Sequence, residues 1–206
     1  MMLKRCSALA LILVLAVSAT ARAETPTNNY YVGRSEDDAE EGANGEVNPA
    51  SDDLDLGQHS GFESAVALGI RFDGIRVAKG RKIKRAFVQF TKDGNRRKAE
   101  PTHLTIHAQL VPDAKAFKEE PKNITSRKLT ETSVKWSPQP WEPTAVPAEK
   151  PRTPDLSAVI QEVVDQDGWK EGNALVLIVT GTGERDAVSF DGGGKENGPM
   201  LRVETE

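Results

Sequence analysis

A strict alternation of apolar and polar side chains over residues 104–110 constrains the fold of this chain more than any other feature. A period of two places alternate side chains on opposite faces of a strand, so this segment predicts a sheet with one buried and one wet face. The apolar members are Leu104, Ile106, Ala108 and Leu110, and the polar members are Thr105, His107 and Gln109.

Other short apolar stretches are separated by Gly, Pro, Asn and Asp, the residues that make turns. Residues 174–179 form a continuous apolar and largely β-branched run, which predicts a central strand covered on both faces. The chain shows no alternation of strands and helices of the βαβ kind. The pattern predicts an all-β fold, a jelly-roll-like antiparallel β-sandwich of about 7–9 strands. The remaining candidate strands are 30–32, 65–72, 83–90, 133–136, 187–190 and 200–203.

One segment, at about residues 154–166, has the periodicity of a short helix. Thr153 is placed to cap it, and Pro154 suits the first turn because its missing N–H has no partner there. Residues 136–154 carry six prolines, which cannot donate ladder hydrogen bonds, so they predict an extended surface strap leading into the helix. The apolar stripe of the helix comprises Leu156, Val159, Ile160, Val163 and Val164.

The first 23 residues have the three parts of a secretory signal. Lys4 and Arg5 precede an apolar run of 10 residues, and a small-x-small cleavage site ends at Ala23. The run is shorter than the roughly 20 residues that span a bilayer, and no later segment is long and apolar enough to do so. We expect a signal peptide at 1–23, a short polar leader at 24–29 and a single β-sandwich domain at 30–206. The exported chain would be extracellular, on the cell surface or periplasmic.

Export changes the composition of the chain in two ways. Cys6 lies in the signal, so the secreted chain has no cysteine and its stability depends on a packed core or a metal rather than on disulfides. Removal of three signal cations takes the formal charge from −4 to −7, and an acidic chain is a poor binder of nucleic acid in general.

Two acidic stretches, within 36–41 and 52–55, offer a dense set of hard oxygen donors. Calcium takes six to eight oxygens, and two such loops meeting at the rim of a sandwich could supply them. The spacing is not that of an EF-hand, and a solvated acidic surface is the alternative. The acids of the two stretches include Asp37, Asp38, Glu40, Glu41, Asp52, Asp53 and Asp55.

Candidate ligand-binding residues are one tryptophan and a cationic cluster. Trp141, in the proline-rich strap, is the tryptophan that we expect to be open to solvent, where it could stack on a sugar ring, whereas Trp136 and Trp169 fit core positions. The cluster of cations from 79 to 85 includes Arg81 and Arg85 and suits an anionic ligand such as a uronate or a sulfated polysaccharide. Solvated turns are the alternative for these cations.

The chain lacks the motifs of common catalytic sites. It has no G-x-S-x-G elbow, no cysteine nucleophile after the signal and no G-x-x-x-x-G-K-[ST] phosphate loop. Paired carboxylates of the glycosidase kind occur by chance among 31 acids, and nothing singles out one of them. We therefore expect a protein that is not an enzyme.

Several short sequence segments, taken in their order along the chain, resemble one group of secreted bacterial domains. Over most of residues 30–204 the order is similar to the DNRLRE-type and family 96 carbohydrate-binding-module sandwiches. The phrases are Ser35-x-Asp37-Asp38-Ala39-Glu40-Glu41, residues 51–56, 66–72, 83–90, 104–106, 141–164, 168–169 and 173–179, Gly183-x-Arg185-x-Ala187, and residues 199–203.

The resemblance implies a jelly-roll sandwich, polysaccharide binding and a structural calcium ion. Its acidic phrases would supply the calcium ligands, Asp38, Glu40, Asp53 and Asp55, and Asp191 would join them if the terminal strands pair. Such domains usually sit in long multi-domain chains, whereas here one stands alone behind a signal. We therefore expect a secreted, non-catalytic, calcium-stabilised carbohydrate-binding module. A structural or adhesive surface protein is the alternative, and a glycan hydrolase or lyase is the third candidate.

Overall fold

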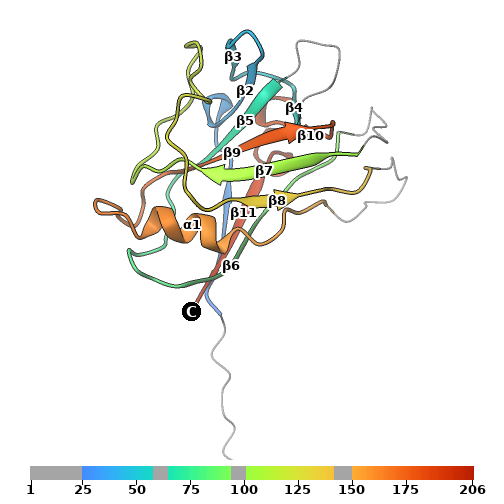
Figure 1. The fold of residues 1–206 in the computed structure, drawn as a ribbon. Coiled ribbons are helices and arrows are strands. Elements are labelled where there is room, and N and C mark those ends of the chain that lie inside the picture. The colour runs from blue at the N-terminus through green and yellow to red at the C-terminus, as the bar shows by residue number, and fades with distance from the viewer. Residues whose placement is uncertain (1–24, 58–64, 94–100, 142–149) are drawn as a thin grey trace, which may run out of the picture.

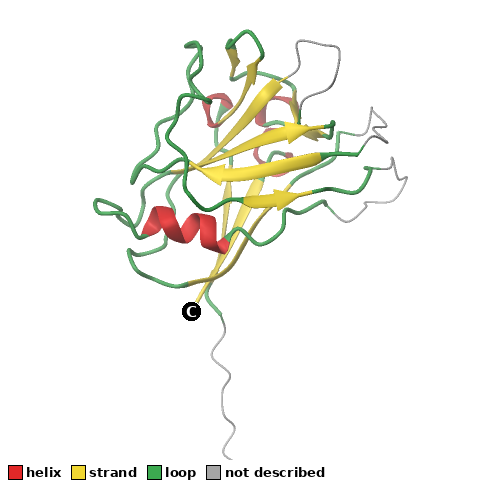
Figure 2. Ribbon diagram, viewed as in Figure 1, coloured by secondary structure: helices red, strands yellow, loops and turns green. Residues whose placement is uncertain are grey.

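The computed structural model describes residues 25–57, 65–93, 101–141 and 150–206. The predicted signal peptide and part of the predicted strap therefore lie outside the described residues. Within these ranges the chain forms eleven β-strands in antiparallel sheets and two short α-helices (Figure 1, Figure 2). The expected all-β class is confirmed. The strand number exceeds the expected range because the acidic residues 38–55 contribute three short strands.

A three-stranded sheet forms one layer of the sandwich, in the order β1 (Thr27–Tyr31), β11 (Met200–Thr205), β6 (Ile83–Gln89). Residues 151–153 continue this sheet beside β6. The Phe90 N–H donates to the Pro151 carbonyl at 2.9 Å, and the Thr153 N–H donates to the Val88 carbonyl at 3.0 Å.

A six-stranded sheet forms the other layer. Its strand order is β3 (Val47–Asn48), β2 (Asp38–Gly42), β5 (Ala65–Phe72), β9 (Leu175–Thr182), β7 (His103–Ala108), β8 (Val134–Trp136). A separate two-stranded ribbon of β4 (Asp53–Asp55) and β10 (Asp186–Val188) lies at the rim.

The two layers together have the strand order of a jelly roll. This becomes clear when eight segments are numbered 1 to 8 in chain order: β1, β5, β6, β7, β8, residues 151–153, β9 and β11. The first layer then has the order 1-8-3-6, and β5, β9, β7 and β8 of the second layer have the order 2-7-4-5.

Strand β9 is buried on both faces, as its continuous apolar sequence predicts. Leu175 and Leu177 belong to the core between the sheets, while Val176 and Ile178 pack under the segment 109–133 on the outer face. Phe117 of that segment lies directly on β5. A Cβ at position 69 would lie 2.3 Å from the Phe117 ring, so only glycine fits there.

Helix α1 (Ser157–Val164) packs against β6 and β7 (Figure 1). All five residues of its predicted apolar stripe are fully buried, which confirms the stripe. The helix begins later than predicted because the residues before it belong to the sheet. Thr153 pairs with Val88, and the Leu156 N–H donates to the Ala86 carbonyl at 2.8 Å.

Helix α2 (Phe190–Asn197) replaces the end of the strand that the sequence predicted at 187–190. The Ser189 hydroxyl accepts the Gly192 N–H at 2.9 Å and so caps its first turn. A Cβ at position 192 would lie 1.8 Å from the Asp52 carbonyl oxygen, so this turn packs backbone to backbone. None of the described helices is long and apolar enough to cross a membrane.

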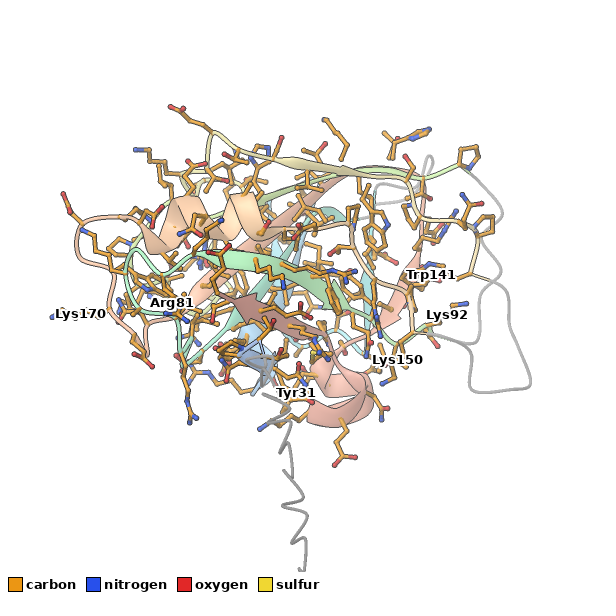
Figure 3. All side chains as sticks on the ribbon, turned by 90° about the horizontal axis from the view of Figure 1, so that it is seen from below. Tyr31, Arg81, Lys92, Trp141, Lys150 and Lys170 are labelled. Carbon is orange, nitrogen blue, oxygen red and sulfur yellow. The ribbon has the colours of Figure 1, made fainter. Side chains whose placement is uncertain are left out.

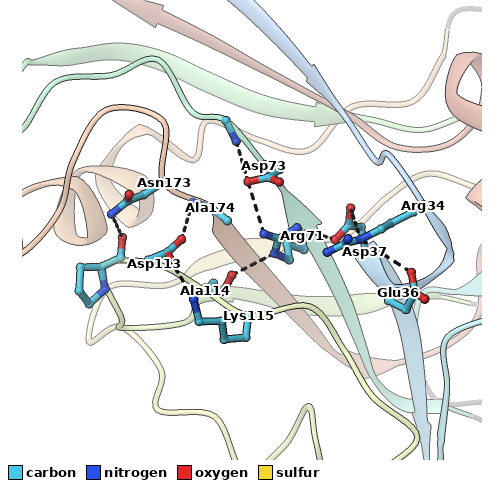
Figure 4. Close-up of polar contacts among 12 residues, drawn as sticks. Arg34, Glu36, Asp37, Arg71, Asp73, Asp113, Ala114, Lys115, Asn173 and Ala174 are labelled. Atoms are coloured by element: carbon cyan, nitrogen blue, oxygen red, sulfur yellow. Dashed lines mark hydrogen bonds and ion pairs between the residues drawn. The ribbon is translucent and has the colours of Figure 1, made fainter.

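A buried arginine ties three segments together (Figure 4). One Arg71 Nη lies 2.6 Å from an Asp37 carboxylate oxygen, which joins β5 to the 3₁₀ turn Ser35–Asp37. The Arg71 Nε–H donates to the Ala114 carbonyl at 2.9 Å, which fastens the covering segment 109–133 to the same point.

Candidate metal centre and ligand groove

Three carboxylates meet at the rim of the sandwich, where β4 pairs with β10. The antiparallel register places Asp186 opposite Asp55, and Glu184 lies two residues earlier along the same extended chain. One carboxylate oxygen from each of Asp55, Glu184 and Asp186 lies within 4.8 Å of the others. Glu184 and Asp186 are buried, and Asp55 is half-buried.

The spacing of these oxygens fits one calcium ion. Calcium–oxygen bonds of about 2.3–2.6 Å put ligands on opposite sides of the ion up to about 5.2 Å apart. All three donors are carboxylates, which are hard ligands that calcium prefers, and neither histidine nor cysteine takes part. The arrangement can hold a divalent cation between the two strands.

A groove of about 610 Å³ borders this carboxylate cluster at Asp55. Asp55 and Glu40 line it, so one of the three cluster carboxylates borders the groove. Its other walls come from the β2–β3 hairpin and the covering segment, with Gly42, Asn44, Glu46, Val47, Asn48, Glu119 and Pro121.

Glu40 adjoins the cluster from β2. Its carboxylate accepts the Asp55 N–H, so it fixes the backbone of one cluster residue. Burial raises the pKa of Glu40 to about 7, and the charges of Asp55 and Asp53 push it in the same direction. Asp53, which begins β4, accepts the Ser51 hydroxyl at 3.4 Å.

Asp38 and Asp191 are not among the three carboxylates that converge. Asp38 is buried and accepts the Phe190 N–H at 2.8 Å, so it holds the start of α2. Burial raises the pKa of Asp38 to about 7, with Asp191 and Asp37 as smaller contributions. Asp191 is exposed in α2, where it accepts the Ser35 hydroxyl at 2.8 Å.

Sequence reasoning found Asp55 but missed Glu184 and Asp186. Two acids at i and i+2 in an extended segment share one face, and that signal was present in the sequence. The register that sets them against Asp55 has no local sequence signal, because β4 and β10 are far apart in the chain.

A second groove, of about 380 Å³, lies beside Trp141. Trp141 is only 9 % exposed, so the expected open aromatic platform is not formed. Its ring packs against Phe90 with centroids 6.5 Å apart, and Trp136 stacks on Phe90 at 5.9 Å. What remains open borders a groove whose other lining residues are Lys92, Pro138, Gln139, Pro140, Lys150, Pro151 and Arg152.

The predicted cationic ligand residues do not lie in this groove. Figure 3 shows Arg81 at one end of the molecule and Trp141 with Lys92 and Lys150 at the other. Arg85 lies on β6, with its guanidinium 5.4 Å from the Phe87 ring centre. The cations that accompany Trp141 are Lys92, Lys150 and Arg152, which sequence reasoning passed over.

Comparison of the sequence with models of known protein families and with curated proteins finds no match. Two features of the molecule carry its functional interpretation. One is the rim cluster of three carboxylates, and the other is the groove that combines tryptophans with cations.

Proposed function

We propose that the protein is an exported, non-catalytic, calcium-stabilised module that binds an acidic polysaccharide. The observation that carries this proposal is the groove beside Trp141. It joins two tryptophans to Lys92, Lys150 and Arg152, and none of the described residues that line it is acidic.

The chemistry of that groove suits a charged sugar. Its volume of about 380 Å³ falls within the roughly 300–1,000 Å³ of small-ligand sites. Ammonium and guanidinium groups pair with carboxylate or sulfate, while the small exposed part of Trp141 adds apolar surface beside them. Three lining cations on a chain of net negative charge would select an anionic glycan over a neutral one.

The carboxylate cluster supports a structural rather than a catalytic role for calcium. Asp55 and Asp186 are cross-strand partners in the β4–β10 ribbon, so an ion held by them and Glu184 would join the two strands. A bound calcium would add positive charge beside three carboxylates, two of which are buried. The resemblance to family 96 carbohydrate-binding modules implies the same pairing of a jelly roll with calcium.

A glycan array tests the proposed function. The secreted form, residues 24–206, is expected to bind acidic polysaccharides such as polygalacturonate and to leave neutral glucans unbound. A variant with Lys92→Ala and Lys150→Ala should lose this binding. Lys170→Ala removes a charge at the opposite end of the molecule and should retain it (Figure 3). The absence of any glycan bound, with calcium and without it, would contradict the proposal.

A further inference from the structure

The segment that carries two of the three cluster carboxylates is also hydrogen-bonded to the wall of the groove beside Trp141. Glu184 and Asp186 belong to the carboxylate cluster, and Arg185 lies between them in the chain. Arg185 exchanges two backbone hydrogen bonds with Leu56, at 2.9 and 3.2 Å, so the pairing of β4 with β10 continues through it. Side chains alternate along an extended segment, so the Arg185 side chain points to the face opposite that of its two acidic neighbours.

The Arg185 guanidinium holds two residues of the groove wall. The side chain is fully buried, and one Nη–H donates to the Glu184 carbonyl at 2.6 Å. The Nε–H donates to the Gln139 carbonyl at 3.1 Å, and the other Nη donates to the Pro138 carbonyl at 3.1 Å. Pro138 and Gln139 both line the groove. One planar group therefore fastens this wall to the backbone of a cluster residue.

Lys92 makes a second connection between the carboxylate cluster and the groove. Residues 91–93 pair with β10 on the edge opposite β4, where Lys92 lies across from Ala187. The Asp93 N–H donates to the Asp186 carbonyl at 3.0 Å. Because Lys92 also lines the groove, β10 lies between one of the cluster carboxylates, on β4, and one of the groove cations.

We propose that an ion in the carboxylate cluster orders the groove through Arg185 and the backbone of Lys92, so that calcium and the glycan bind cooperatively. An ion held by Asp55 on one strand and by Glu184 and Asp186 on the other would fix β10 relative to β4. Three lining residues of the groove are attached to that segment. Ordering them in advance removes part of the entropic cost of binding a ligand, so the coupling is positive. The inference rests on the proposed function and adds the regulation of its site.

The first arm of the test needs no glycan. Calcium is titrated into residues 24–206, with EDTA as the reference, while ¹⁵N NMR follows the backbone amides of Lys92, Gln139 and Trp141. We expect these signals to shift saturably, whereas the amide of Lys170, at the opposite end of the molecule, stays fixed (Figure 3). Asp186→Asn removes one cluster carboxylate and should abolish the shifts.

Arg185→Lys tests the connection itself. Lysine keeps the charge but lacks the planar fork that reaches two carbonyl groups at once. Calcium should still raise the melting temperature of this variant and still shift the Lys92 amide, but the Gln139 amide should no longer respond. Arg81→Lys is the same change at the opposite end of the molecule and should respond as wild type does (Figure 3). Thermal unfolding checks that each variant folds, and the wild-type and Asp186→Asn titrations stand without it.

The second arm measures the coupling with a galacturonate trimer, by titration calorimetry at fixed ionic strength. The affinity for the trimer should fall about fivefold or more when calcium is replaced by EDTA, the lower end of usual couplings between sites. Linkage is reciprocal, so the trimer should raise the affinity for calcium by the same factor. Calcium binding by the free trimer is measured separately and subtracted.

The coupling and the proposed function fail in different ways. Equal trimer affinity in calcium and in EDTA, in protein whose melting temperature calcium raises, would reject the coupling and leave glycan binding standing. A Gln139 response that persists in Arg185→Lys would reject Arg185 as the link. A melting temperature and groove amides that calcium leaves unchanged would overturn the coupling as well. If the trimer binds under neither condition, the proposed function fails, and the titrations without glycan decide the coupling.

Discussion

Asp37 and Asp73 both lie near Arg71, but they differ in burial and therefore in energetic weight. The Asp37 side chain is 4 % exposed and lies 2.6 Å from the guanidinium, whereas the Asp73 side chain is 65 % exposed at 3.4 Å. Asp37→Ala should cost about 3–5 kcal/mol of unfolding free energy, because it leaves the buried Arg71 guanidinium without the nearer of its two carboxylate partners. Asp73→Ala should cost less than about 1 kcal/mol. Urea unfolding checks both, and equal losses would contradict this reading of the network.

Asp186 is the cluster residue through which the calcium proposal can be tested by substitution. In wild-type protein, calcium should raise the melting temperature relative to EDTA, since a ligand of the folded state stabilises it. Asp186→Asn should abolish that rise, because it removes one of the three cluster carboxylates. Asp191→Asn, at an exposed site outside the cluster, is the matched control and should respond to calcium as wild type does. A preserved response in Asp186→Asn would place the ion outside this cluster.

Strand β2 fastens the covering segment to the sheet through Glu41. The Glu41 carboxylate accepts the N–H groups of Ile124 and Thr125 at 2.9 and 2.8 Å, and also the Thr125 hydroxyl. Glu41→Ala should speed amide exchange at Ile124 and Thr125 by more than tenfold while β9 amides stay protected, because each bond to a charged group is worth about 1.5–3 kcal/mol. Glu46→Ala, on the exposed hairpin, should leave exchange at these two amides unchanged.

Strands and helices with apolar periodicity could be predicted from the sequence, whereas the acidic strand β2 could not. The strands around Leu104 and Leu177 and the stripe of α1 follow from side-chain pattern alone, since burial dictates that pattern. Strand β2 is acidic because its carboxylates accept backbone donors of distant segments, as Glu40 does from Asp55. Such partners are set by tertiary structure, so no local window of sequence reveals them.

The candidate sites were predictable to a similar, partial degree. Asp55 and Trp141 were identified from residue type and neighbours. Their partners came from elsewhere, because the register of β4 with β10 brings in Asp186 and the path of residues 150–152 brings in Lys150. Long-range strand pairing brings together residues that are far apart in the chain. The sequence therefore reveals single residues of such a site but not which residues join them.

Stability of the whole molecule should depend on pH through its buried carboxylates. Burial raises the pKa values of Asp38 and Glu40 to about 7, above their ordinary values of 3.8 and 4.5. Between these limits the folded state keeps protons that the unfolded chain releases, so stability falls as pH rises from about 4 to about 7.

Glu40→Gln separates this contribution from other titrations. The amide cannot ionise, so in EDTA the variant should gain stability over wild type by about 1–3 kcal/mol more at pH 8 than at pH 5. Urea unfolding at the two pH values measures the difference. A gain that is equal at both pH values would show that Glu40 ionises normally in the folded protein.

The central claim is that an acidic glycan binds in the groove beside Trp141, and the tryptophan indole N–H signals test it most directly. A ¹⁵N NMR titration of residues 24–206 with acidic oligosaccharides would follow Trp136, Trp141 and Trp169 together. The Trp169 indole donates to the Val77 carbonyl at 2.9 Å inside the core and serves as an internal reference. The account predicts a saturable shift of the Trp141 signal while Trp169 stays fixed. No movement of Trp141 at saturating ligand, or equal movement of all three signals, would contradict it.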